Sequence, residues 1–268
     1  MAKQTKSPGQ ASPGKQSDAA SGYDWSKVGA TGFENVQRED LGIPFFSIVE
    51  SKSPEFDKTN KEYQAKKIVG CGPGDVFNNL SREILHKYEG TPMIVVPCSF
   101  ERAYVEWKPR NSGGGLVRVH KNPRILNEAE RNEKNQDILK NGNLLVTTAY
   151  FYCLLLSGQD RIPMILGMKS TQLKKARFWL NLQQGIKFTN PRGEKYTPPM
   201  FSHSYELSTG PEVNEEGSWF GWKIATHEQL KDPLLIADAI ETSKKAITGQ
   251  RIALPSPTGK TEDDVPFA

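Results

Sequence analysis

The sequence has few cysteines and no long apolar run. Its 268 residues include only Cys71, Cys98 and Cys153, whose odd number and wide spacing argue against a disulfide framework or a Cys-x-x-Cys metal site. No apolar stretch is long enough to span a bilayer, and residues 1–16 lack the apolar segment of a secretory signal. We therefore expect a protein of a reducing, cytoplasmic compartment with no membrane partner.

Apolar residues are also scarce for a chain of this length. The hydrophobic fraction is 36% and the mean hydropathy is -0.58, so we expect a core smaller than the length suggests. The formal net charge is only +4. This charge permits a nucleic-acid-binding surface without requiring one, because a local basic groove can coexist with acids elsewhere.

Motifs of enzyme active sites are absent. The sequence contains no His-Glu-x-x-His, Gly-x-Ser-x-Gly or Asp-x-Asp metal pattern, and its three consecutive glycines at 113–115 match neither common phosphate-loop motif. The carboxylates Glu101, Glu106 and Asp160 are scattered along the chain. We expect a protein that is not an enzyme and has no cofactor and no metal, with a magnesium-dependent nuclease as an alternative.

Composition divides the chain into three parts. Residues 1–40 are rich in Ser, Gly, Lys and Gln and are expected to form a flexible leader. Residues 41–250 carry the apolar periodicity of one folded domain. Residues 251–268 contain turn residues followed by acids, and are expected to form a disordered acidic tail.

The periodicity within 41–250 predicts five strands and two helices. An apolar run at 43–49 begins the domain, and strands are expected at 93–107 (as two segments, 93–97 and 100–107, or as one strand bent near Pro97), 144–156, 162–168, 200–207 and 219–225. Residues 108–143 are expected to form a long polar connection. Ser170 is expected to cap a helix at 171–187, and a second helix is expected at 233–247. A helix between the third and fourth of five strands favours a mainly β fold, the oligonucleotide/oligosaccharide-binding (OB) Greek-key barrel.

The segment 100–107 has the most informative alternation. Phe100, Arg102 and Tyr104 are expected on one face of the strand, and Trp107 on the other. An aromatic ring, a cation and a second aromatic ring, each about 7 Å from the next along a strand, suit bases stacked on either side of a bound phosphate. The alternative is that Phe100 and Tyr104 belong to the core.

Other aromatic and basic residues suggest further contacts with a nucleic acid. Tyr150 and Tyr152 share one face of the 144–156 strand, where they could stack on bases or be buried. A basic loop follows Trp107, and cations surround the start of the 171–187 helix, where an anionic ligand would offset their unfavourable position. An ordinary solvated loop and helix face are the alternatives. These predicted phosphate contacts are Lys108, Arg110, Arg118, Lys169, Lys174, Lys175 and Arg177.

The C-terminus ends in an acidic Pro-Phe peptide. It resembles the tip with which bacterial and phage single-stranded-DNA-binding (SSB) proteins recruit replication and repair enzymes. Here Ala268 follows the phenylalanine, and the acidic run is short. The resemblance implies a partner-binding role for Asp263, Asp264, Val265, Pro266 and Phe267.

Three segments of the domain are similar to motifs in phage proteins, some of which are described as SSB proteins. They are FERAYVEWKPRNSGGGLVRVH, GMKSTQLKKARFW and GSWFGW. Together with the tail, they make the chain resemble a phage-type SSB protein. This resemblance implies an OB fold, coating of single-stranded DNA during phage replication and recombination, no cofactor, location in the host cytoplasm, and the capacity to form a homo-oligomer. A phage structural or scaffold protein is the main alternative.

Overall fold

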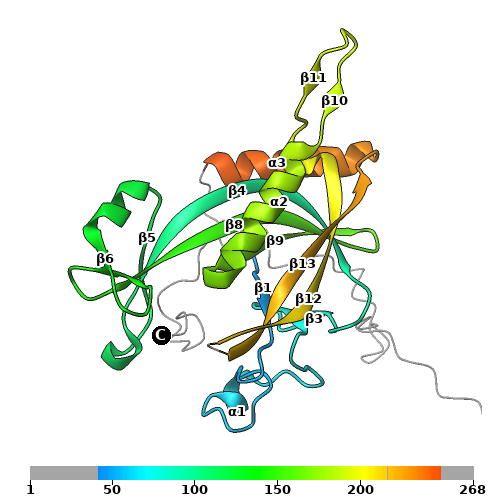
Figure 1. The fold of residues 1–268 in the computed structure, drawn as a ribbon. Coiled ribbons are helices and arrows are strands. Elements are labelled where there is room, and N and C mark those ends of the chain that lie inside the picture. Colours follow the sequence, from blue (N-terminus) through cyan, green and yellow to red (C-terminus); the bar gives the residue numbers. More distant parts are fainter. Residues whose placement is uncertain (1–41, 216, 249–268) are drawn as a thin grey trace, which may run out of the picture. The chain divides into compact units, whose positions relative to one another are not determined.

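A curled antiparallel sheet forms the centre of the structure (Figure 1). The computed structural model describes residues 42–215 and 217–248. The chain divides into two units, Met1–Leu41 and Gly42–Ala268, and all described residues belong to the second. Within them, an eight-stranded sheet has the order β13-β12-β4-β8-β7-β6, with β5 pairing to β4 and β9 pairing to β8. The prediction of a mainly β fold with few helices is confirmed, and the sheet curves into a half-barrel.

The strands of this sheet differ greatly in length. They are β4 (Met93–Trp107), β5 (Leu116–His120), β6 (Ala129–Arg131), β7 (Asp137–Leu139), β8 (Leu144–Ser157), β9 (Asp160–Lys169), β12 (His203–Asn214) and β13 (Gly217–Gln229). Smaller sheets join β1 (Phe46–Ile48) to β2 (Val76–Asn78) and β3 (Ile84–His86), and β10 (Phe188–Thr189) to β11 (Lys195–Tyr196). The α-helices are α1 (Tyr63–Lys66), α2 (Leu173–Gly185) and α3 (Pro233–Thr248). The short 3-10 helices are η4 (Arg110–Ser112), η5 (Pro123–Glu128), η6 (Ser170–Gln172) and η7 (Met200–Ser202).

The two longest strands, β4 and β8, pair along almost their whole length. Their register runs from Ile94 opposite Leu156 to Trp107 opposite Leu144, and it shifts between Pro97 and Ser99. An extra residue at this point bends β4, because the bulged strand must travel further than its partner. Of the two interpretations of residues 93–107, one strand bent near Pro97 is therefore the observed one.

The connection between β4 and β8 is more ordered than the sequence predicts. Residues 108–143, called the β4–β8 arm below, contain η4, β5, η5, β6 and β7 instead of an unstructured polar loop. Strand β5 pairs with the end of β4, and β7 pairs with the start of β8. The prediction failed here because strands of three to five residues are too short to show periodicity. Strands β5 and β7 form because β4 and β8 offer them pairing partners, which the sequence of the arm does not reveal.

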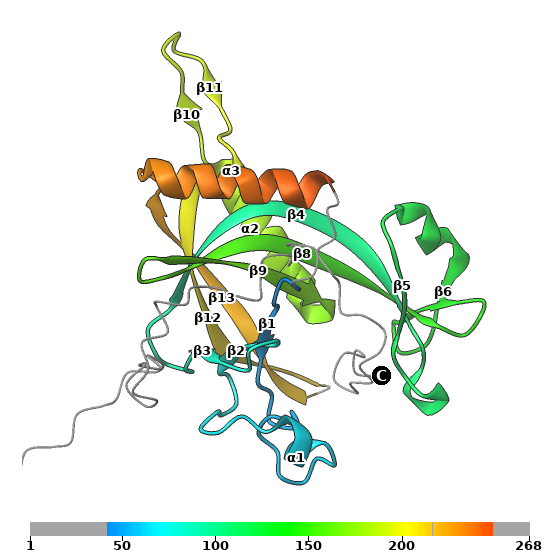
Figure 2. The ribbon, with the colours of Figure 1, turned by 180° about the vertical axis from the view of Figure 1, so that it is seen from behind.

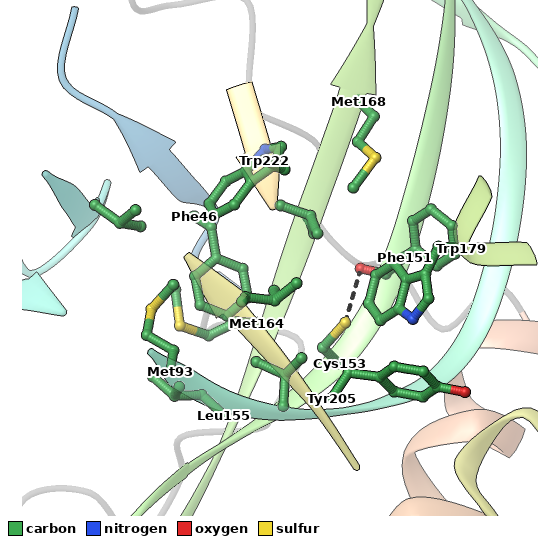
Figure 3. Packing of buried hydrophobic residues seen from close by; sticks show 14 of the residues in the cluster. Phe46, Met93, Phe151, Cys153, Leu155, Met164, Met168, Trp179, Tyr205 and Trp222 are labelled. Carbon is green, nitrogen blue, oxygen red and sulfur yellow. Dashed lines mark hydrogen bonds between the residues drawn. The ribbon is translucent and has the colours of Figure 1, made fainter. Parts of the chain in front are cut away.

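A large hydrophobic core fills the side of the sheet that faces α2, called the inner face. Trp179 of α2 is fully buried there, with its ring centroid 4.4 Å from that of Phe151 and 5.5 Å from that of Tyr205. Figure 3 shows these rings beside Cys153, with Phe46, Met164 and Trp222 grouped in another part of the same core. One helix, α2, thus packs against rings from β8 and β12 and holds the two parts of the curled sheet together.

The opposite, outer face is covered by α3, as Figure 2 shows from behind. Ala239 of α3 packs with Val96 and Leu154 from β4 and β8. Arg161, near the β8–β9 turn, forms ion pairs with Asp232 (2.7 Å) and Asp238 (2.6 Å) at the start of the helix. The predicted helix at 233–247 is confirmed. None of the helices in the described ranges is long and apolar enough to cross a membrane.

The segment just before and after β1 lies between β9 and β13. The Ile165 N–H of β9 donates a 2.8 Å hydrogen bond to the carbonyl of Pro44. The Phe220 N–H of β13 donates to the Glu50 carboxylate at 3.1 Å, and the rings of Phe46 and Trp222 meet edge to face. The early apolar run therefore connects two strands that do not pair directly with each other.

The start of α2 differs from the expected cap. Ser170 begins η6, with φ 49°, and α2 itself begins at Leu173 without a side-chain hydrogen bond from Gln172 at its N-cap. The Gln172 side chain instead accepts a hydrogen bond from the Trp222 N–H at 3.2 Å. The helix is confirmed, whereas the Ser170 cap is wrong because the chain turns through η6 before α2.

Candidate nucleic-acid interface

The predicted site residues of β4 are divided between its two faces. Phe100, Arg102 and Tyr104 lie on the inner face, opposite Phe151, Ala149 and Thr147 of β8 respectively. Trp107 belongs to the outer face, in one cluster with Ala103, Val105 and residues of β8. The side chains predicted to share a face of this strand therefore do share a face in the structure.

Arg102 is the exposed member of the inner-face trio. On one side of it, Phe100 packs 5.1 Å from Phe151, which lies beneath Trp179 of α2. On the other side, Tyr104 is buried against the β4–β8 arm. Arg102 thus lies between the helix and the arm, above the small side chain of Ala149, and its guanidinium is open to a ligand.

The arm is fastened to the sheet through a buried carboxylate, Glu106. Its side chain accepts hydrogen bonds from His120 Nε2 (2.8 Å), Asn141 Nδ2 (2.9 Å) and Asn143 Nδ2 (2.6 Å). Burial raises the pKa of Glu106, but the hydrogen bonds from Asn143, His120 and Asn141 outweigh it and hold the pKa below its usual value. Glu106 therefore keeps its negative charge and joins β4, β5 and the turn before β8.

Exposed cations follow along the arm. Lys108, Arg118 and Arg124 are exposed, and within the described ranges none of them has an ion-pair partner. Arg118 lies opposite Glu106 in the β4–β5 pairing, so it is on the same inner face as Arg102. Arg110 begins η4, and its side chain lies outside the described part of the structure.

The cations at the start of α2 do not all remain available. Lys175 forms a 2.7 Å ion pair with Glu212 of β12, and Lys174 lies 3.6 Å from the same carboxylate. Arg177 is exposed and, two positions after Lys175, lies about 200° around the helix. The arm lies on the side of α2 away from β12 and β13 (Figures 1 and 2). Arg177 thus adds a positive charge to the side of α2 away from Glu212.

Four residues make up what we call the Arg102 surface: Phe100, Arg102 and Arg118 on the inner face, and Arg177 on helix α2, which packs over that face. Two of them come from β4, one from β5 and one from α2. The three cations are exposed and the aromatic ring is half-buried. Such a set can bind phosphates through the guanidinium groups and can place a base beside the ring.

The tyrosines expected to stack on bases are buried. Tyr150 and Tyr152 lie on the outer face and are 8% and 5% exposed, with Phe45 packed edge to face on Tyr150 at 6.1 Å. The Tyr152 hydroxyl donates to Glu101 Oε2 at 2.8 Å, and burial followed by this bond raises the pKa of Tyr152. Ala246 of α3 also covers this cluster. Base stacking on either tyrosine would require this cover to move.

Two further predicted residues on the outer face are also engaged. Trp107 is 7% exposed, and Lys169 Nζ lies 5.6 Å from its ring centroid, a cation–π contact. Tyr104, on the inner face, is 6% exposed. Of the five predicted aromatic contacts, Trp107, Tyr150 and Tyr152 thus lie on the outer face and Phe100 and Tyr104 on the inner face, and all but the half-buried Phe100 are core residues in this conformation.

Sequence reasoning missed the role of Glu106. Its three partners are 14, 35 and 37 residues away in sequence, so no local pattern connects them.

Over the described ranges, no group of three His, Cys, Asp or Glu side chains is placed to hold a metal ion. The tail residues Asp263, Asp264, Val265, Pro266 and Phe267 lie outside the described residues.

Comparison with known proteins gives one match. The family model described as Pam3 phage gp34-like protein matches residues 13–252. No curated protein and no solved structure matches the chain.

Proposed function

We propose that this chain, which belongs to the Pam3 phage gp34-like protein family, binds and coats single-stranded DNA during phage replication or recombination. In this proposal the protein is not an enzyme and needs no cofactor. The Arg102 surface and the exposed cations of the β4–β8 arm bind the phosphate backbone. Phe100 is the aromatic residue of this surface that is placed to stack on a base.

The order of the long strands is the observation that carries the proposal. Numbered along the chain, β4, β8, β9, β12 and β13 lie in the sheet in the order 5-4-1-2-3, with α2 between the third and the fourth. A five-stranded OB barrel has this order, with its helix in the same place. The order therefore supports an OB fold, in which segment 44–50 lies between the third and fifth strands.

The position of the free cations agrees with this interpretation. OB folds bind oligonucleotides on the face of strands 2 and 3 and in the loops that follow strands 1 and 4. The first of these loops is the β4–β8 arm, which carries Lys108, Arg118 and Arg124. Because the outer face of β8 and β9 is covered, we assign the primary contact to the arm and the neighbouring Arg102 surface.

A salt series gives the first test of the proposal. Each phosphate neutralised on a single strand contributes about 0.7 to the slope of log K against log salt. If Arg102, Arg118, Arg124 and Arg177 each bind one phosphate, the slope is about -3. The measurement is fluorescence anisotropy of labelled oligo-dT at several salt concentrations, with and without Mg²⁺. Saturable, salt-dependent binding without cleavage supports the proposal, whereas no binding favours a structural protein and cleavage a nuclease.

Charge reversal locates the contact. The double variant Arg102→Glu/Arg118→Glu is expected to bind oligo-dT at least about tenfold more weakly, with a slope lower by about 1.4. Lys58→Glu is the matched control, because Lys58 is also exposed but lies near α1. Equal losses in the double variant and in the control would contradict the placement of the site.

The second part of the proposal concerns the C-terminal tail. The peptide Asp263–Asp264–Val265–Pro266–Phe267 would recruit a replication or recombination enzyme through one apolar pocket rimmed by cations. Its acids would also compete with DNA for the basic surface. Deleting residues 261–268 is expected to tighten oligo-dT binding slightly and to abolish partner recruitment. Unchanged DNA affinity together with unchanged partner binding would refute this role.

A further inference from the structure

A two-stranded hairpin extends away from the main sheet immediately after α2. It consists of β10 and β11, which pair only through Phe188 opposite Tyr196 and Thr189 opposite Lys195. Figures 1 and 2 both show it projecting beyond α2 and α3, at the opposite end of the described structure from α1. Isolated hairpins are marginally stable in water, so a hairpin this short depends on local interactions or on a partner.

The tip of the hairpin is held in one conformation by Asn190. Its side-chain oxygen accepts hydrogen bonds from the backbone N–H groups of Arg192 (2.9 Å) and Glu194 (3.0 Å). Its side-chain nitrogen donates to the Glu194 carboxylate at 2.8 Å. The Gly193 N–H donates to the Asn190 carbonyl at 2.9 Å. These bonds fix the backbone at Arg192 and hold the Glu194 carboxylate beside Asn190.

The base of the hairpin is anchored through aromatic contacts, which leave one ring exposed. Phe188 meets His203 of β12 at 5.9 Å and the ring of Tyr196 edge to face at 6.0 Å. Tyr196 itself is 46% exposed. A half-exposed tyrosine on an extended hairpin contributes little to folding, but it can stack on a planar ligand.

Positive charge dominates the rest of the hairpin. Lys187, Arg192 and Lys195 are all exposed, and the one acid between them, Glu194, is bound by Asn190. Lys187 Nζ donates one hydrogen bond to Thr197 Oγ1 at 2.6 Å, and an ammonium group has three donors. Exposed cations beside an exposed aromatic ring match the chemistry of single-stranded nucleic acid, which offers phosphates and unpaired bases side by side.

We propose that the β10–β11 hairpin is a second contact for single-stranded nucleic acid. Tyr196 stacks on a base, and Lys187, Arg192 and Lys195 bind the neighbouring phosphates. The proposal rests on the proposed function, because it assigns the hairpin to a strand that also contacts the Arg102 surface. About five extended residues carry the tip roughly 16 Å from the base of the hairpin. The hairpin therefore strengthens binding only of an oligonucleotide that is long enough to reach both the Arg102 surface and the hairpin.

The test is a length series of labelled oligo-dT bound to the full chain and to hairpin variants. Tyr196→Ala is expected to weaken binding of long oligonucleotides about 5- to 150-fold and to leave the shortest ones that bind unaffected. Tyr196→Phe, which keeps the ring, should restore most of the affinity. Arg192→Glu/Lys195→Glu should lower the salt slope on long oligonucleotides by about 1.4, whereas Lys58→Glu should not.

Photocrosslinking gives an independent readout. A long oligonucleotide carrying 5-bromodeoxyuridine should crosslink to Tyr196, identified by mass spectrometry of the digested complex. If long oligonucleotides bind all variants equally and no crosslink forms at Tyr196, the hairpin proposal fails while DNA binding stands. If the full chain binds no oligonucleotide, the proposed function fails first. A change in oligomeric state of Tyr196→Ala without loss of DNA affinity would instead assign the hairpin to contact with a second copy.

Discussion

Removing the Glu106 carboxylate should release the β4–β8 arm from the sheet. Glu106 is 5% exposed and receives three hydrogen bonds, from His120, Asn141 and Asn143. The Glu106→Ala substitution leaves these three donors without their acceptor. Because they belong to the arm or to the turn that ends it, the loss should be concentrated in residues 108–143.

The magnitude follows from the burial of the donors. Leaving a buried donor without its acceptor typically costs about 1–3 kcal/mol, and Glu106→Ala does this to three donors. Asn141 is exposed and can turn toward water, whereas His120 and Asn143 are only partly exposed. Water can therefore satisfy some of the released donors, and we expect the lower end, a loss of about 3 kcal/mol in the free energy of unfolding.

Urea denaturation and hydrogen exchange together measure this effect. The unfolding free energy should fall in Glu106→Ala, and amide exchange should accelerate most in β5, β6 and β7. The control is Glu130→Ala, at an exposed position of β6, which should stay within about 0.5 kcal/mol of the unsubstituted protein. A loss below about 0.5 kcal/mol in Glu106→Ala, or unchanged exchange in the arm, would refute the role given to this carboxylate.

The same network has a pH dependence of known sign. The folded state holds the pKa of Glu106 below its usual value, so its carboxylate binds protons less readily than in the unfolded chain. The stabilisation is therefore fully present above the unfolded pKa and is lost as pH falls through the lowered folded pKa. The difference between the unsubstituted protein and Glu106→Ala should be large at pH 7 and should shrink in acid.

Three further changes test the packing of the half-barrel. Trp179→Ala removes a fully buried ring that lies 4.4 Å from Phe151, and should lower the free energy of unfolding in urea by about 3–5 kcal/mol; a loss below about 1 kcal/mol would contradict its central position. Burial raises the pKa of Glu50 to about 7 despite its hydrogen bond from Phe220, so folding stability should fall as pH rises from 4.5 to 7. In melting curves, Glu50→Gln should remove most of this fall in stability with pH and should be more stable than the unsubstituted protein at pH 8. An unchanged pH profile in Glu50→Gln would show that Glu50 is not the source of the pH dependence. Gly74 has φ +89°, and an added Cβ would lie 2.6 Å from Phe220, so Gly74→Ala should cost about 1–3 kcal/mol in urea denaturation, whereas a neutral result would show that the loop can move aside.

Local patterns were sufficient for the long elements. Strand β8 is dense in β-branched and aromatic residues, and its predicted bounds differ from the observed ones by one residue at its end. The bend of β4 at Pro97 and the two long helices were also predictable, because proline and a 3.6-residue apolar period act within a few residues of themselves.

The arm and the state of the site residues were not predictable in this way. Strand β5 is stabilised by pairing with β4, β7 by pairing with β8, and β6 by pairing with β7, and no local pattern in the arm contains the positions of β4 and β8. Lys175 is neutralised by Glu212, 37 positions later in the sequence. The alternation correctly assigned Tyr150 and Tyr152 to one face. It did not indicate which segment of the chain covers that face.

The sequence by itself determined which residues form the long strands and helices, and which side chains share a face of a strand. These properties depend on neighbours along the chain, through backbone geometry and side-chain period. Only the tertiary structure decided which face is covered. Helix α3 and Phe45 bury the tyrosines of the outer face, whereas Arg102 remains exposed between α2 and the arm. Burial depends on contacts between segments far apart in sequence, so the same alternating pattern can produce a core face or a binding surface.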